Sequence, residues 1–130
     1  MHKKKIAHRD LKLANILIND DYKLKLADFG FSKDYESGYL KSFCGTPLSM
    51  APEILKHEQY NERCDVWSLG VLTYMMLYNR PPYFPTKSDG VGIVGITNAV
   101  TLRNHKFEEN VQVSLSGKKF INECLKKKMN

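Results

Sequence analysis

A long apolar run at residues 64–78 constrains the fold of this chain more than any other stretch. Only Asp65, Ser68 and Thr73 are polar within it, so a helix over these residues would be apolar on nearly every side. Such a helix is buried rather than amphipathic. We therefore predict a buried central helix that ends at Asn79, just ahead of two consecutive prolines.

A cluster of chemically capable side chains lies near the start of the chain. Residues 8–15 are His-Arg-Asp-Leu-Lys-Leu-Ala-Asn, followed at once by the apolar residues 16–18 and, after a polar turn, by the alternating residues 23–26. This pattern predicts a β-hairpin with the polar loop at one end. Pairing of the two strands would bring Asn15 close to Asp28, which is the geometry that two ligands of one cation need.

Several short motifs follow one another along the chain in a set order. They are His8-Arg9-Asp10-Leu11-Lys12-Leu13-Ala14-Asn15, Asp28-Phe29-Gly30, Gly45-Thr46-Pro47, Ala51-Pro52-Glu53 and Asp65-Val66-Trp67-Ser68-Leu69-Gly70. Each tripeptide alone is a weak signal, but their joint order is a strong one. From residue 6 to about residue 83 the chain resembles the C-terminal lobe of the eukaryotic protein kinases, of the serine/threonine type.

This resemblance implies a mainly α fold, a protein-kinase-like C-lobe with a small β-hairpin beside the catalytic loop. It divides the chain into a catalytic loop at 8–15, an activation segment at 28–53 and a central helix at about 64–78. A complete kinase domain is much longer than 130 residues, and neither a glycine-rich phosphate loop nor the phosphate-binding lysine of the family precedes the catalytic loop. We therefore expect residues 1–130 to be a partial kinase domain, truncated at its N-terminal side.

The resemblance also implies the chemistry of phosphoryl transfer, with ATP and Mg²⁺ as cofactors. Asp10 matches the catalytic base, and Lys12 would neutralise the γ-phosphate as its charge moves. Thr46 matches the threonine that reaches back to these two residues, and both it and Lys12 favour a serine/threonine kinase over a tyrosine kinase. Asn15 and Asp28 match the two metal ligands, whose oxygen atoms suit Mg²⁺.

Other motif residues match structural positions of the family. Leu17 resembles the floor under the adenine ring of ATP, although core packing alone would also account for it. His8 and Phe29 resemble two members of an internal hydrophobic spine. We expect His8 to be tied to Asp65, because a lone aspartate in an apolar helix is costly unless it is paired. Glu53 resembles the anchor of the activation segment, but its usual arginine partner is not in these 130 residues, which weakens that anchor.

Two residues suggest regulation by phosphorylation. Arg9 precedes the catalytic aspartate, as in kinases that are switched by a phosphate on the activation segment, which gives the arginine a bidentate partner. Ser42 stands four residues before Thr46, where the primary phosphosite of the family falls. The hypothesis is that a phosphate on Ser42 orders residues 31–46, and the alternative is an exposed loop serine of no consequence. Ser49 replaces a tyrosine of the family pattern, which predicts weaker packing there.

The remaining segments carry weaker signals. The polar stretch 31–44 predicts a long loop. The glycines of 90–95 fit the spelling G-x-G-x-x-G of a phosphate-binding loop, but no strand precedes them, and we expect them to loosen or replace a helix. Ser116 is expected to cap a last helix. The apolar face of that helix would be formed by Phe120, Ile121, Cys124 and Leu125.

Charge and cysteine content limit the cellular setting. The net charge of +6 comes partly from the lysine runs 3–5 and 126–128; basic chains can bind nucleic acid, but short terminal lysine runs are more often solvated, so nucleic acid is disfavoured as a partner. Cys44, Cys64 and Cys124 are odd in number and lack C-x-x-C spacing, which favours a reduced, cytosolic setting. No stretch has the ~18 apolar residues of a membrane span or resembles a signal peptide, so we expect a soluble, cytoplasmic protein without a membrane partner.

Two functions remain open from the sequence. The first is a serine/threonine protein kinase that transfers the γ-phosphate of ATP to a protein substrate. The second is a kinase-derived interaction module that is catalytically inactive because its ATP-gripping lobe is absent. Without that lobe much of the ~7–11 kcal/mol available from positioning is lost, so the isolated chain is expected to be inactive or weakly active. The sequence carries no signal for an oligomeric state.

Overall fold

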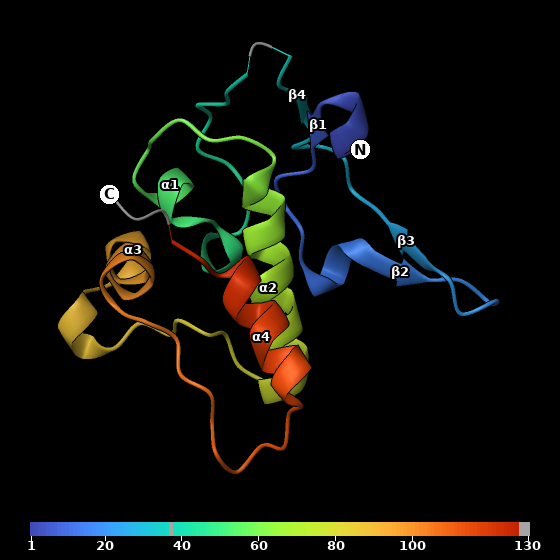
Figure 1. Cartoon of the computed structure of the whole chain (residues 1–130). Coiled ribbons are helices and arrows are strands. Elements are labelled where there is room, and N and C mark those ends of the chain that lie inside the picture. The colour runs from blue at the N-terminus through green and yellow to red at the C-terminus, as the bar shows by residue number, and fades with distance from the viewer. Residues whose placement is uncertain (37, 128–130) are drawn as a thin grey trace.

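The fold is organised around α2 (Arg63–Tyr78), which runs through the centre of the molecule (Figure 1). The structure, a computed structural model, describes residues 1–36 and 38–127. Asn79 closes the helix in the left-handed conformation, with a φ of 53° and an amide that donates to the carbonyl oxygen of Met75 at 2.9 Å. The predicted central helix and its end at Asn79 are therefore confirmed.

One side of α2 is exposed, although the sequence predicted a helix that is buried on nearly every side. Val71 and Tyr74 belong to the hydrophobic core, whereas Val66, Leu69 and Met76 are exposed. The exposed residues are three and seven positions apart, so they follow one side of the helix. The expectation of all-round burial is wrong for this side, because the described residues cover only the others.

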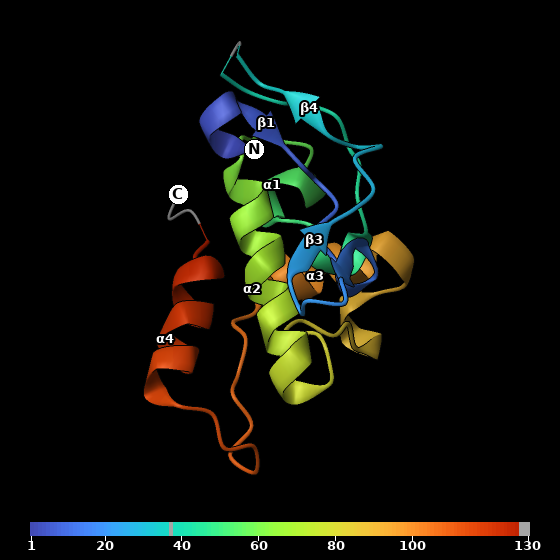
Figure 2. The ribbon, with the colours of Figure 1, turned by 90° about the vertical axis from the view of Figure 1, so that its right-hand side faces the viewer.

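The last helix, α4 (Leu115–Cys124), lies alongside α2 in both views (Figures 1 and 2). Gly70 of α2 permits this close approach, since a Cβ atom at that position would lie only 2.6 Å from the Cβ of Cys124. Ile121 and Leu125 are buried in the contact. Two elements distant in sequence thus share one tightly packed interface.

The start of α4 differs from the sequence expectation. Its N-cap is Ser114, whose side chain accepts a hydrogen bond from the amide of Gly117 at 3.1 Å. The prediction of Ser116 as the cap is wrong, because the backbone is already helical at Leu115. Phe120 was also expected on the buried face, but its side chain is exposed.

The glycine motif at 90–95 does not disrupt helix formation. α3 (Gly92–Leu102) begins within the motif, after the short 3₁₀ helix η4 (Lys87–Asp89). Gly95 is buried inside the helix, and a Cβ atom there would lie 2.4 Å from the carbonyl oxygen of Gly90. The expectation of a loosened or replaced helix is wrong, since the glycine permits a close backbone contact at the helix start.

Two small antiparallel sheets complete the described architecture. In the first, β1 (Ile6–Ala7) pairs with β4 (Lys33–Asp34). In the second, β2 (Ile16–Ile18) pairs with β3 (Leu24–Leu26) in the register Ile16 to Leu26 and Ile18 to Leu24. The second sheet is the predicted hairpin, which projects from the helical body (Figure 1). The other short elements are α1 (Pro52–Leu55) and the 3₁₀ helices η1 (His2–Lys4), η2 (Leu13–Asn15) and η3 (Pro47–Ser49).

Residues 31–44 form mostly irregular structure, as predicted for a long loop. Within the described residues, the exceptions are β4 and one isolated antiparallel bridge between Leu40 and Tyr60. In the part of the chain that the structure covers, no helix is both long enough and apolar enough to cross a membrane. The mainly helical, C-lobe-like fold expected from the sequence is confirmed.

Candidate active site

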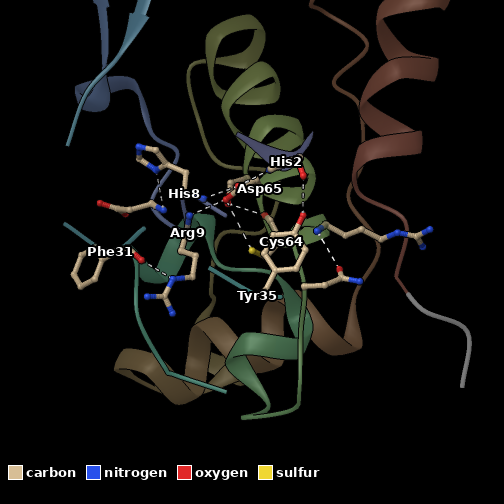
Figure 3. A network of polar contacts seen from close by, with 11 residues as sticks. His2, His8, Arg9, Phe31, Tyr35, Cys64 and Asp65 are labelled. Carbon is tan, nitrogen blue, oxygen red and sulfur yellow. Dashed lines mark hydrogen bonds and ion pairs between the residues drawn. The ribbon is translucent and has the colours of Figure 1, made fainter. Parts of the chain in front are cut away.

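The 8–15 loop is bound to one buried carboxylate on α2, that of Asp65. The backbone amides of His8 and Arg9 donate to Oδ2 and Oδ1 of Asp65, each at 2.8 Å (Figure 3). Asp65 is almost fully buried, so these bonds offset much of the cost of removing its charge from water. Arg9 adopts a positive φ of 70°, a strained conformation that the two bonds help to hold.

The predicted tie between His8 and Asp65 exists, but it runs through the backbone rather than the imidazole ring. Nδ1 of His8 accepts the amide of Asp10 at 3.3 Å, which leaves Nε2 protonated to donate to the carbonyl oxygen of Ala27 at 3.1 Å. The ring also meets Phe29 edge-on, with centroids 5.3 Å apart. His8 therefore joins the 8–15 loop to the chain just after β3, while Phe29 stays half-exposed.

A further histidine, His2, also contacts Asp65 and was missed by the sequence analysis. Its Nε2 lies 2.8 Å from Oδ2 of Asp65, the oxygen that also accepts the amide of His8 (Figure 3). The phenolic group of Tyr35 donates to the carbonyl oxygen of His2 at 3.3 Å. No local pattern near the first residues marks His2, because its partner is 63 positions away.

Asp10 is the centre of a compact polar network. One carboxylate oxygen accepts the hydroxyl of Thr46 at 2.6 Å, and the other lies 2.7 Å from Nζ of Lys12. Nζ of Lys12 also donates to Thr46 at 3.2 Å, which closes the triangle. Burial by itself would raise the pKa of Asp10, but hydrogen bonds from Lys12 and Thr46 and the lysine charge outweigh it and hold the pKa below its usual value.

Asn15 is buried next to this network and is oriented by it. Its Nδ2 donates to the backbone oxygen of Asp10 at 2.9 Å and to Oδ2 of Asp10 at 3.3 Å. Because the amide nitrogen is turned toward Asp10, the side-chain oxygen points elsewhere and can serve as a ligand. The carbonyl oxygen of Asn15 accepts the amide of Ala27 at 2.8 Å, which places the residue next to the end of β3.

Asp28 lies two residues after the end of β3 and has a positive φ of 59°. Its side chain is exposed, and Oδ1 accepts the amide of Gly30 at 3.2 Å. A carboxylate on one strand end and the Asn15 amide oxygen on the other suit Mg²⁺, which takes oxygen ligands and needs few of them from the protein when phosphates and water supply the rest. Within the described residues, no group of three or more His, Cys, Asp or Glu side chains could hold a metal without such help.

Leu17 lies on the exposed hairpin rather than in the core. Its side chain is 54% exposed in the middle of β2. Simple core packing, the alternative explanation of this residue, is therefore wrong for the described structure. An exposed apolar side chain beside Asn15 remains available for contact with an apolar ring.

Arg9 and Ser42, the two predicted regulatory residues, are linked through Tyr60. The guanidinium of Arg9 donates through Nε to the carbonyl oxygen of Phe31 and through Nη1 to the hydroxyl of Tyr60. That hydroxyl in turn donates to the carbonyl oxygen of Ser42 at 2.7 Å. Tyr60 was not among the predicted site residues, because a tyrosine in the loop before α2 carries no recognisable sequence pattern.

The segment around Ser49 is held by hydrogen bonds. Oγ of Ser49 donates to the carbonyl oxygen of Thr46 at 2.9 Å, and the carbonyl oxygen of Ser49 accepts the hydroxyl of Ser68 on α2 at 2.8 Å. Ser49 is buried. A polar anchor to α2 therefore stands where the sequence analysis expected the loss of aromatic packing.

Glu53 makes no ion pair among the residues that the structure covers. It lines a cleft together with Arg63 and Trp67 of α2 and the end of α4. The indole Nε1 of Trp67 is buried there without a hydrogen-bond partner in the same described part. Glu53 thus has no charged partner in the described part of the chain, and this end of the 28–53 segment is held by apolar burial of Met50 and Ala51 instead.

Comparison with known proteins gives one consistent result. The family model described as protein kinase domain matches residues 1–130. Among similar proteins, serine/threonine-protein kinase pakG of Dictyostelium discoideum is 48% identical over 94 residues, which cover 68% of this chain and 8% of that protein. Probable serine/threonine-protein kinase MARK-B of the same organism is 38% identical over 126 residues, or 95% of this chain and 17% of that protein.

A third relative is a shorter protein than the other two. Calcium/calmodulin-dependent protein kinase type 1 of Caenorhabditis elegans is 42% identical over 87 residues, which cover 65% of this chain and 25% of that protein. The chain thus spans a quarter or less of the length of each of these three relatives.

Proposed function

Because the chain belongs to the protein kinase family, we propose that it carries the catalytic residues of a serine/threonine protein kinase. The reaction is the transfer of the γ-phosphate of ATP to a serine or threonine hydroxyl of a protein substrate. The observation that carries this proposal is the hydrogen-bonded triangle that Lys12 and Thr46 form with the buried Asp10. The similarity to proteins named serine/threonine-protein kinases supports the same proposal.

Asp10 is the proposed catalytic base. Its low pKa keeps the carboxylate ionised at neutral pH, so it can orient and accept the proton of the attacking hydroxyl. Thr46 holds one carboxylate oxygen, and Lys12 balances the charge of the other. As negative charge moves onto the transferred phosphoryl group, the same lysine is placed to stabilise it.

Asn15 and Asp28 are the residues that would hold Mg²⁺, which when bound would neutralise the charge of the ATP phosphates. Asn15 is fixed by its bonds to Asp10, so the metal ligand and the base share one rigid support. Leu17, exposed on the adjacent strand, would contact the adenine ring. Leu17, Asn15 and Asp28 would together bind ATP from the side of the hairpin.

The decisive experiment is phosphate transfer by the longest natural protein that contains residues 1–130. Asp10→Asn should lower the rate of phosphorylation of a serine peptide about 10²- to 10⁴-fold, because it removes the base. Asp20→Asn, an exposed substitution in the hairpin turn, serves as the matched control and should leave the rate unchanged. Equal activity of the Asp10→Asn variant and the unsubstituted protein would contradict the proposed role.

A second candidate is a kinase-derived interaction module without catalysis. It is favoured by the exposure of Leu17, Ile18 and Leu24 on the hairpin, where the described residues provide no cover for a nucleotide. Thermal unfolding of the 130-residue chain with millimolar Mg-ATP separates the two candidates. Stabilisation that is lost in Asp28→Asn supports nucleotide binding, whereas an unchanged melting temperature supports the interaction module for this chain.

A further inference from the structure

Tyr60 is a buried residue of the loop between α1 and α2 that contacts the 28–53 segment twice. It is only 2% exposed. Its backbone forms an isolated antiparallel bridge with Leu40: the Leu40 amide donates to the Tyr60 carbonyl oxygen at 2.7 Å, and the Tyr60 amide donates to the Leu40 carbonyl oxygen at 3.0 Å. The loop therefore holds the 28–53 segment at Leu40 by main-chain bonds alone.

The side chain of Tyr60 makes the second contact, two residues further on. Its hydroxyl donates to the carbonyl oxygen of Ser42 at 2.7 Å and accepts Nη1 of Arg9 at 3.0 Å, with the Sγ of Cys44 at 3.9 Å. Burial raises the pKa of Tyr60 to about 12, although Arg9 pulls it the other way. The hydroxyl thus stays protonated at neutral pH and remains a donor to Ser42.

Arg9 connects this contact to the proposed catalytic base. Its amide is bound to Asp65, and it directly precedes Asp10. The 28–53 segment passes so close to Arg9 that a Cβ atom on Gly45 would lie 2.5 Å from the Arg9 carbonyl oxygen. One residue later, Thr46 reaches Asp10. The chain from Leu40 to Thr46 is therefore fastened at both ends and in its middle.

We propose that Tyr60 is a positioning residue that docks residues 40–46 onto Arg9 without any phosphate on Ser42. The inference rests on the proposed function for its catalytic meaning, because the docked segment delivers Thr46 to Asp10. Two of the five N–H donors of the Arg9 guanidinium are used for Phe31 and Tyr60. A phosphate on Ser42 would engage the remaining donors of Arg9 and act on a segment that is already docked.

The test compares Tyr60→Phe with Tyr74→Phe in the 130-residue chain. Both substitutions remove one hydroxyl from a buried tyrosine; that of Tyr74 donates to the carbonyl oxygen of Lys106 at 2.7 Å, away from the 28–53 segment. Trypsin cleavage after the exposed Lys41 reports release of residues 40–46. We expect Tyr60→Phe to speed this cleavage roughly three- to tenfold, as expected for a lost hydrogen bond, and Tyr74→Phe to leave it unchanged.

A spectroscopic measurement separates positioning from general destabilisation. The side-chain N–H resonances of Arg9 should shift in Tyr60→Phe and stay in place in Tyr74→Phe, since only the first variant removes a partner of the guanidinium. Arg9→Met breaks the same contact from the other side; it is measured in parallel and keeps the test valid if Tyr60→Phe does not fold. Combining it with Tyr60→Phe should give less than the sum of the two separate effects, because both substitutions remove the bond between Arg9 and Tyr60 while only Tyr60→Phe removes the bond to Ser42.

Two results would overturn the proposal. One is unchanged cleavage after Lys41 in a folded Tyr60→Phe variant, and the other is an equal acceleration in Tyr74→Phe. Neither measurement requires ATP or catalysis, so a failure of this inference is distinguishable from a failure of the proposed kinase activity.

Discussion

The 8–15 loop and the β2–β3 hairpin are adjacent in sequence but are held in different ways. The loop is bound to the buried Asp65 through two backbone amides and to the 28–53 segment through Asp10 and Thr46. The hairpin is held by its own strand pairing and exposes Leu17 and much of its other apolar surface. Polar bonds to the core fix the first region, while the second has little support beyond itself.

This difference matches the different tasks that the two regions would have in phosphoryl transfer. A base must keep a set geometry relative to the reacting hydroxyl, and a misplacement of about 1 Å can cost 10²-fold in rate. A nucleotide platform instead needs accessible surface, and Leu17, Asn15 and Asp28 lie along the hairpin. Rigid support by α2 and access on the hairpin are thus complementary features of one site.

The largest expected effect comes from removing the carboxylate of Asp65, which holds the 8–15 loop. Asp65→Ala would leave the buried amide of His8 and the partly buried amide of Arg9 without an acceptor, and each such group costs about 1–3 kcal/mol. We expect the free energy of unfolding to fall by about 2–6 kcal/mol, a large part of the total for a domain. Urea denaturation measures the change.

A hairpin substitution provides the control for this prediction. Asp20→Ala removes a carboxylate from the exposed turn and should alter the free energy of unfolding by less than about 0.5 kcal/mol. A similar loss of stability in both variants would show that the loop depends on the core no more than the hairpin does.

A middle-sized effect is expected where the 28–53 segment touches the loop. Gly45 has a φ of 114°, and a Cβ atom there would lie 2.5 Å from the Arg9 carbonyl oxygen, whereas Gly38 has a φ of 97° and nothing within 4 Å. Both glycine-to-alanine substitutions incur backbone strain of about 1–3 kcal/mol, but only Gly45→Ala must also displace the loop. We expect Gly45→Ala to be the more destabilising in thermal unfolding by at least about 1 kcal/mol.

The matched Gly38→Ala variant makes this prediction specific. If the two variants lose the same stability, strain at a positive φ is the whole effect, and the close approach of the segment to Arg9 contributes nothing. The contact between Gly45 and Arg9 would then no longer count among those that hold the 8–15 loop more firmly than the hairpin.

Local patterns in the sequence predicted the elements on both sides of this comparison. The apolar run at 64–78 and the alternation at 23–26 have the periodicities of a buried helix and a strand, and both elements formed. The tie of His8 to Asp65 was predicted as a pairing of residues, but the sequence does not distinguish a backbone amide from a ring nitrogen. Tertiary placement alone decides which of the two groups reaches the carboxylate.

The residues that the sequence analysis missed share a physical cause. Tyr60 meets Arg9 from 51 positions away, and His2 meets Asp65 from 63 positions away. Such contacts leave no local periodicity, so only the folded chain reveals them. The contact between Gly95 and Gly90 joins residues close in sequence, but it could not be predicted either, because the same glycine pattern occurs in loops, in turns and at helix starts.

The smallest expected effect lies on the hairpin itself. Leu17→Thr keeps a strand-forming residue at a position that is 54% exposed, so the free energy of unfolding should change by less than about 0.5 kcal/mol. Val71→Thr places the same hydroxyl in the core of α2, where Val71 is 1% exposed, and should cost about 1–3 kcal/mol. Urea denaturation of both variants gives the contrast directly. If Leu17→Thr lowers the free energy of unfolding by more than about 1 kcal/mol, the hairpin depends on burial of this side chain. If the free energy of unfolding is nearly unchanged, Leu17 contributes little to folding and its side chain is available to contact a ligand.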